Sequence, residues 1–216
     1  TLDTALTAGV RLVGNLTVTG IASGSETSAL TTYTTAKTGA TTNKLTASDT
    51  NWSVAAATLD TALAAAVRLN GDLTVIDIAS NDESGASTTY SKTATGASNV
   101  MLTASDGTWS VAASALDTDL GNDIKYAGAL TVTDIATDDK VAALTGYTTA
   151  KTGATTNTLT ADGTWSLAVG ALTTALGDGV RLAGALTVTG ITDEAAALTD
   201  YTATTTGATS VTLTAN

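Results

Sequence analysis

Acidic side chains are the residues of this sequence best suited to chemistry, and they recur in adjacent pairs. The pairs are Asp82-Glu83, Asp138-Asp139 and Asp193-Glu194, with Glu26 alone at the corresponding position near the start. Calcium prefers oxygen ligands such as these carboxylates, so one interpretation is calcium binding. The competing interpretation places the pairs at helix starts, where negative charge complements the helix dipole. We favour helix starts, because neither an EF-hand loop nor a glycine-rich calcium repeat accompanies the pairs.

The residue types on which most catalytic sites depend are missing from the sequence. It contains no His and no Cys. The common nucleophile–base pairs and the usual zinc sites therefore cannot be built. Neither a phosphate-binding Walker A loop nor a dinucleotide-binding fingerprint is present. We therefore expect a protein that is not an enzyme and that carries no cofactor.

Threonines follow a Thr-x-Thr pattern in segments that alternate polar and apolar residues. The candidates for a surface-facing row are Thr17, Thr19, Thr131, Thr133, Thr187 and Thr189. Aligned hydroxyls and methyls would suit O-linked glycans or contact with an ice surface, although Lys44 and Ile76 interrupt the rows. The alternative is that Thr simply favours strands and keeps an exposed face polar.

Charge and hydropathy restrict the partners. The net charge of −11 argues against nucleic acid, because a phosphate backbone demands a basic face, and against anionic lipid surfaces. The longest Ala-rich stretch, Val54 to Val67, is interrupted by Asp60, so we expect no membrane insertion. The sequence begins with Thr1 and shows no signal peptide, from which we expect a chain that is processed or cut from a longer one.

These residues are all carried by a tandem repeat. Trp52, Trp109 and Trp165 lie 57 and 56 residues apart, and most of the sequence recurs with them. The repeats run over residues 1–57, 58–114, 115–170 and an incomplete 171–216. Such a period is typical of architectures in which each unit stacks on its neighbours. We expect one elongated array with two turns per repeat.

The expected elements are short strands and short helices. Leu-Thr-Val segments alternate apolar and β-branched polar residues, as half-buried strands do, and so does Val180-Arg181-Leu182. We predict helices from Asp193 and from N-caps at Ser53, Ser110 and Ser166, whereas the Thr-rich stretch 31–42 is poor in helix formers. The sequence predicts an α/β solenoid with parallel strands and short helices. An all-β parallel solenoid is the alternative.

The segment Trp109-Ser110-Val111-Ala112-Ala113, with Leu116-Asp117 and then Leu130-Thr131-Val132-Thr133-Asp134, resembles the Thr/Ala/Asp-rich tandem repeats of large secreted bacterial surface proteins of the cyanobacterial type. This resemblance covers the whole chain. It implies an extracellular, cell-surface location and a structural or adhesive role without catalytic residues.

The two ends of the array lack the polar cap with which solenoids usually close. Leu2 and Leu6 at one end, and Val211 and Leu213 at the other, are the candidate residues for self-association. Contacts of this head-to-tail kind do not close and generate filaments. We expect a structural subunit of an extracellular filament or surface layer whose partners are copies of itself. The alternative is an adhesin module that binds glycans or another surface such as ice.

Overall fold

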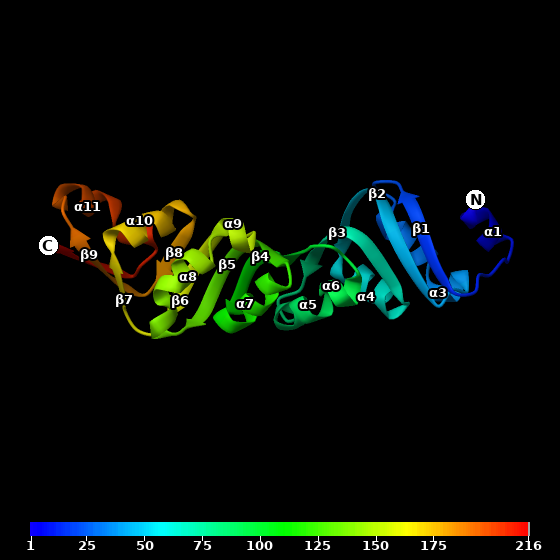
Figure 1. Cartoon of the computed structure of the whole chain (residues 1–216), viewed down its shortest axis with the longest axis horizontal. Coiled ribbons are helices and arrows are strands. Elements are labelled where there is room, and N and C mark those ends of the chain that lie inside the picture. Colours follow the sequence, from blue (N-terminus) through cyan, green and yellow to red (C-terminus); the bar gives the residue numbers. More distant parts are fainter. Residues whose placement is uncertain (216) are drawn as a thin grey trace. The chain divides into compact units, whose positions relative to one another are not determined.

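The computed structural model describes residues 1–215, which form parallel β-strands joined by short helices (Figure 1). The prediction of an α/β fold with parallel strands is therefore confirmed, and the all-β alternative is wrong. Seven strands make one sheet in the order β1-β2-β3-β4-β5-β6-β8, and three make another in the order β10-β9-β7. By internal contacts the chain divides into two compact units.

The first unit comprises Thr1–Asp106 with Asn122–Ile124. Its elements are α1 (Leu2–Thr7), β1 (Asn15–Ile21), α2 (Glu26–Thr32), α3 (Thr35–Thr38), β2 (Thr42–Ala55), α4 (Ala56–Ala64), β3 (Val67–Ile78), α5 (Glu83–Thr89), α6 (Lys92–Thr95) and the first part of β4 (Val100–Ala112). The second unit comprises Gly107–Gly121 and the chain from Lys125 on. Its elements are α7 (Ala113–Gly121), most of β5 (Ile124–Ile135), the 3₁₀ turn η1 (Thr137–Asp139), α8 (Lys140–Gly146), α9 (Thr149–Thr152), β6 (Thr156–Ala161), β7 (Trp165–Ala168), α10 (Val169–Gly177), β8 (Val180–Ala183), β9 (Ala185–Ile191), α11 (Glu194–Asp200), α12 (Ala203–Thr206) and β10 (Ser210–Ala215).

The register of the parallel strands places apolar residues beside apolar residues of the neighbouring strand. In the first unit Leu45 of β2 lies between Val18 of β1 and Leu69 of β3, and Leu45 and Leu69 are fully buried. Residues on either side of these in sequence face the opposite way, which is the period-2 pattern of a half-buried strand. The expected alternation of Val180-Arg181-Leu182 is confirmed in β8, where only the arginine is part-exposed.

The Trp-Ser-Val segments are strands, which corrects the prediction that Ser53, Ser110 and Ser166 cap helices. Trp52 pairs with Leu73 and Trp165 with Leu186, and the helices begin three residues beyond each serine. The signal was present in the sequence, because Trp, Ser and Val alternate large apolar with polar. Each Trp side chain is at most 2% exposed. The indole Nε1 atoms of Trp52, Trp109 and Trp165 donate to the backbone carbonyls of Asn70, Ala127 and Ala183.

The Thr-rich stretches contain single helical turns, contrary to the expectation from helix propensity. Thr38, Thr95, Thr152 and Thr206 end these turns and are fully buried. Each hydroxyl donates to the carbonyl four residues earlier and accepts the amide two residues later, so the threonine closes its own turn. The following glycine has φ of +81° in every case, a left-handed conformation that only glycine adopts freely.

Arginines link the helices to the strands that follow them. Nη1 of Arg68 donates to the carbonyls of Leu63, in the last turn of α4, and of Val67. Nη1 of Arg181 makes the corresponding contacts with Leu176 and Val180. A cation at this place complements the negative end of the helix dipole.

Candidate self-association surfaces and acidic grooves

The free edge of β1 exposes side chains of the core type. Among the strands of residues 1–215, β1 pairs with β2 alone. Leu16 and Val18 of β1 are part-exposed, whereas the corresponding Leu73 and Val75 of β3 are at most 1% exposed. Leu16 and Leu73 are thus the same residue type at the same position of the repeat, as are Val18 and Val75. Their exposure differs because a second strand covers only the residues of β3.

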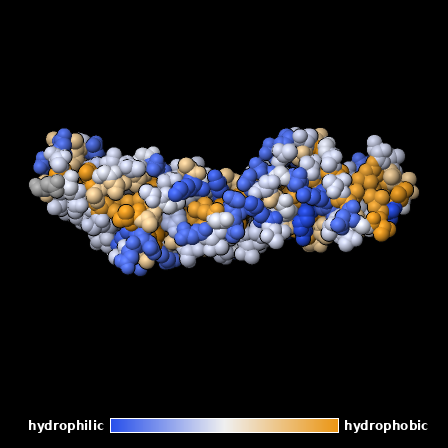
Figure 2. Space-filling model, in the orientation of Figure 1, coloured by the Kyte–Doolittle hydropathy of each residue, from blue (hydrophilic) through white to orange (hydrophobic). Residues whose placement is uncertain are grey.

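The same contrast holds for the residues before β1. Leu2 and Leu6 of α1 are part-exposed, while Leu59, which corresponds to Leu2, is fully buried. Val10 is 47% exposed and Val13 is fully exposed. Figure 2 shows an extended hydrophobic surface where Figure 1 places α1. The predicted residues Leu2 and Leu6 are thus accompanied in this part of the chain by further apolar side chains that are exposed or part-exposed, those of Val10, Val13 and Leu16.

A second free edge belongs to β10, which pairs only with β9 in the part of the chain that the structure describes. Val211 and Leu213 are part-exposed, whereas the corresponding Val100 and Leu102 are at most 1% exposed. Leu198 of α11 adds to this surface. It is 69% exposed, while the corresponding Leu30 and Leu144 are at most 2% exposed. Leu198 was not among the predicted self-association residues, although its correspondence to the other two leucines is visible in the repeat.

The six candidate threonines do not form one uninterrupted row. Thr17 and Thr19 are exposed, and Thr131, Thr133, Thr187 and Thr189 are part-exposed. Thr17 is next to Lys44, which is next to Arg68, so charged side chains follow the hydroxyl along that row. Thr187 lies between Ser166 and Thr212, so three hydroxyl side chains are neighbours across these strands.

The acidic pairs lie at helix starts, as predicted. Glu26, Glu83 and Glu194 are in the first turns of α2, α5 and α11. Asp138 and Asp139 form η1, directly before α8. Asp193 caps α11 by accepting the amide of Ala196 at 3.0 Å. Within residues 1–215 no three acidic side chains come together in a way that could hold a metal ion.

Other carboxylates gather in grooves, one beside each of three Tyr residues. A groove of about 440 Å³ is lined by Asp60, Asp77 and Asp82 together with Tyr90. One of about 350 Å³ is lined by Asp117, Asp134 and Asp139 together with Tyr147. The corresponding groove at Tyr33, about 360 Å³, has only Asp3. These grooves bring together acidic residues distant in sequence, which the adjacent acidic pairs alone did not indicate.

Each groove contains a Tyr–Asp hydrogen bond that joins two helices. The hydroxyl of Tyr33 donates to Asp3 at 2.7 Å, and that of Tyr147 donates to Asp117 at 2.9 Å. The hydrogen bond to Asp3, together with burial, raises the pKa of Tyr33 to about 12. For Tyr147, burial followed by the bond to Asp117 also raises the pKa. The tyrosines therefore stay protonated and keep donating at neutral pH.

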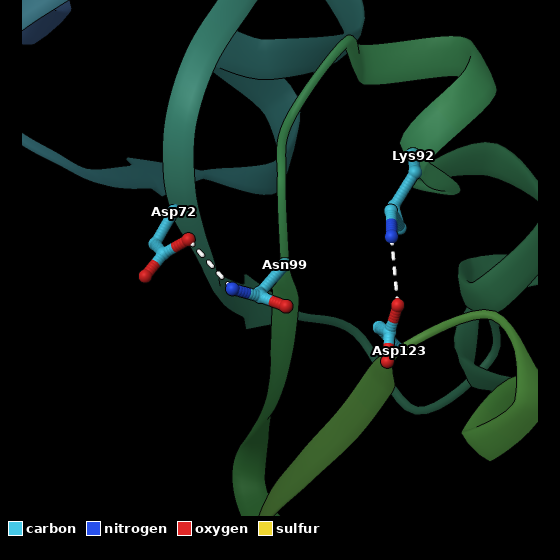
Figure 3. A network of polar contacts seen from close by, with 4 residues as sticks. All are labelled: Asp72, Lys92, Asn99 and Asp123. Carbon is cyan, nitrogen blue, oxygen red and sulfur yellow. Dashed lines mark hydrogen bonds and ion pairs between the residues drawn. The ribbon is translucent and has the colours of Figure 1, made fainter.

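Two polar contacts join neighbouring segments of the first unit near β3 (Figure 3). Nδ2 of Asn99 donates to Asp72 of β3 at 2.8 Å, and Nζ of Lys92 forms an ion pair with Asp123 at 2.7 Å. At the position of Lys92, the hydroxyl of Thr35 instead donates to the carbonyl of Ala65. The two repeats thus join these segments differently, by an ion pair at Lys92 and by a bond to a backbone carbonyl at Thr35.

One position in the helices changes charge between repeats. Lys140 is 8% exposed, and its Nζ donates to the carbonyls of Asp162 and Thr164, 5.8 Å from the ring centre of Trp165. The corresponding residues of the first unit are Glu26 and Glu83, and Oε1 of Glu83 is buried without a hydrogen-bond partner among the described residues. Burial, and secondarily the charge of Asp106, raise the pKa of Glu83.

Among residues 1–215, no helix combines the length and the hydropathy needed to cross a membrane. Comparisons with protein-family models, curated proteins and solved structures found no match.

Proposed function

We propose that this chain is a structural protein, a subunit of an extracellular filament or surface layer in which copies associate head-to-tail. Its architecture in this proposal is a solenoid with two turns per repeat of about 57 residues. The strand order of the seven-stranded sheet supports the winding, since β2, β3 and β6 each pair in parallel with an earlier strand and with a later one. The surface-protein resemblance supports the location.

The observation that carries the proposal is the exposure of core-type residues at the two free strand edges. Leu16 and Val18 on β1, and Val211 and Leu213 on β10, are covered wherever a further strand is present at the corresponding position. Exposed edges of this kind are usually blunted by charges, bulges or short strands, because they accept other strands. Two different edges on one chain give a contact that repeats without closing.

The test is sedimentation velocity combined with electron microscopy of the purified chain over a wide range of concentration. We expect end-to-end oligomers that lengthen as concentration rises. A single monomeric species at every concentration, seen by both methods, would contradict the proposal.

A second candidate function, an adhesin that binds glycans, is favoured by the grooves. Repeated acidic hollows beside Tyr90 and Tyr147 offer carboxylate acceptors to a sugar's hydroxyl groups. Binding to a glycan array that D60N and D117N both weaken would support it, and an array without signal would count against it. Thermal hysteresis measurements address the ice-binding form of this alternative.

A further inference from the structure

The residues Val10–Val13 lack the strand partner that their counterparts have. The corresponding residues of β3 begin at Val67, and those of the second unit form β8, from Val180 to Ala183. Both pair in parallel with the preceding strand: Leu45 lies opposite Leu69, and Leu159 lies opposite Leu182. In this structure Val10–Val13 form no strand, and Val10 and Val13 are the most exposed valines at this edge.

This unpaired segment nevertheless has the local contacts of its paired counterparts. Nη1 of Arg11 donates to the carbonyls of Leu6 and Val10, as Arg181 does to Leu176 and Val180. A Cβ on Gly39 would lie 2.9 Å from the carbonyl oxygen of Leu12, the same separation as between Gly96 and Leu69. The segment is therefore already held in position to accept a strand. Such preorganisation lowers the cost of association.

The free edge of β10 likewise has the local contacts of its paired counterpart, β6. The amide of Thr209 donates to the carbonyl of Gly184 at 2.8 Å, as Thr155 does to Gly128 before β6. β10 pairs with β9 from Val211 onward in the register in which β6 pairs with β5. Val211 thus corresponds to Asn157, Leu213 to Leu159 and Thr214 to Thr160. On its other side β6 pairs with β8, placing Thr160 opposite Ala183.

The helix α11 is less covered than its counterparts α2 and α8. α2 packs against α4, and α8 packs against α10, and in these pairs Leu30 and Leu144 are buried. Leu198 of α11 occupies their position and is 69% exposed. No helix follows α12 in residues 1–215 to take the place of α4. α1, which corresponds to α4, has exposed apolar residues of its own.

We propose that β10 of one copy pairs in parallel with Val10–Val13 of a second copy, with Leu213 opposite Leu12 and Thr214 opposite Val13, while α1 of the second copy covers Leu198. This rests on the proposed head-to-tail function and specifies its interface. Val10–Val13 change from an irregular segment to a strand when the contact forms.

The chain has no Cys, so single cysteines report the register. V13C and T214C are prepared separately, mixed, and oxidised mildly. Paired strands lie about 4.8 Å apart, within the roughly 4.4–6.8 Å between Cα atoms that a disulfide spans. We expect a V13C–T214C heterodimer. T212C is the off-register control, because its Cα lies roughly two strand residues, about 6.6 Å, further along; it should cross-link with V13C at least fivefold less.

Two aspartate variants test the helix contact. Leu198 and Val141 are similarly exposed, at 69% and 63%, on the corresponding helices α11 and α8. L198D is expected to weaken self-association at least tenfold, whereas V141D leaves it unchanged. Circular dichroism checks that both variants fold.

The results of these experiments distinguish a wrong interface from a wrong head-to-tail function. In-register cross-linking with a selective effect of L198D supports the inference. Self-association of the unmodified chain without preferential V13C–T214C cross-linking, or with equal effects of L198D and V141D, overturns this interface and leaves head-to-tail assembly standing. Absence of self-association at every concentration overturns both.

Discussion

Asp119 and Tyr126 replace, in one repeat only, an alanine and a leucine of the core. The corresponding residues elsewhere are Ala62 with Leu69 and Ala175 with Leu182, all at most 2% exposed. The Tyr126 hydroxyl donates to the Asp119 carboxylate, and the Tyr126 ring meets Trp109 edge-on, with ring centres 4.9 Å apart. Asp119 is only 7% exposed. The two substitutions are complementary, because each supplies the polar partner that burial of the other requires.

Removing one partner of the Asp119–Tyr126 hydrogen bond should lower the free energy of unfolding more than removing both polar groups does. D119A is expected to lower the free energy of unfolding by about 1–3 kcal/mol, since it takes a hydrogen-bond acceptor away from a buried hydroxyl. D119A/Y126F, which keeps the ring against Trp109, should recover most of that loss. Urea denaturation of the two variants and of Y126F gives the interaction energy. A double variant less stable than D119A would contradict the argument.

Glu83 is expected to oppose folding at neutral pH. Its pKa is raised above the ordinary value of 4.5, so the folded state holds the proton more tightly than the unfolded state. The resulting stabilisation is complete below the unfolded pKa and is lost as pH rises through the folded pKa. E83Q should therefore raise the melting temperature at pH 7 and flatten its dependence on pH above 4.5. The exposed E194Q is the control. Identical pH profiles for wild type and E83Q would refute the prediction.

At the scale of the elements, the single-turn helices depend on tertiary contacts. A helix of four residues is far too short to be stable by itself. α3 and α9 are held by a buried Asn of the following strand: Asn43 and Asn157 both donate through Nδ2, to the carbonyls of Tyr33 and Tyr147 and to the hydroxyls of Thr38 and Thr152. At α6 the corresponding strand residue is Val100, so Thr95 has no Asn partner there. The turn is held by the backbone contacts of Thr95 and by Ser91, whose Oγ accepts the amide of Ala94 at 3.4 Å.

This difference predicts unequal costs for the same substitution. T38V removes a hydroxyl that bonds to two backbone groups and to Asn43, and it leaves the buried Asn43 amide with fewer partners. T95V removes only the two backbone contacts. Each lost hydrogen bond is worth about 0.5–1.5 kcal/mol, so T38V should be the more destabilising of the two by about 1 kcal/mol. Both residues lie in the first unit, which makes urea denaturation a matched comparison. Equal losses would show that Asn43 does not depend on Thr38.

At the scale of the whole molecule, charge and exposed apolar edges act in opposite directions. The net charge of −11 makes copies repel one another. The proposed interface is mostly apolar, with Leu213, Leu12 and Leu198 at its centre. Self-association should therefore strengthen with salt, because screening removes the repulsion and leaves the apolar contact.

The salt dependence is measurable by sedimentation at fixed protein concentration. Raising NaCl from about 10 mM to about 1 M shortens the Debye length from about 30 Å to about 3 Å. We expect oligomers to become larger and more abundant over this range. Dissociation by salt would point instead to an interface made of ion pairs.

The sequence by itself determined the features that depend on local pattern and period. Leu-Thr-Val alternation placed the strands, acidic pairs placed several helix starts, and the spacing of the tryptophans identified which residues occupy corresponding positions. It also identified Leu2, Leu6, Val211 and Leu213 as candidate self-association residues, all four of which are part-exposed apolar side chains.

Other features depend on residues distant in the chain and follow from how the elements pack. The alternation of Trp52-Ser53-Val54 is visible in the sequence, but its pairing with Leu73-Thr74-Val75 is what makes it a strand and not a helix start. Thr38 ends a helical turn because Asn43 and the turn's own backbone satisfy its hydroxyl. The acidic grooves and the exposure of Leu198 likewise depend on which element covers which. The physical reason is the same throughout: propensity contributes less than about 1 kcal/mol per residue, whereas burial and buried hydrogen bonds, which require partners from elsewhere in the chain, contribute more.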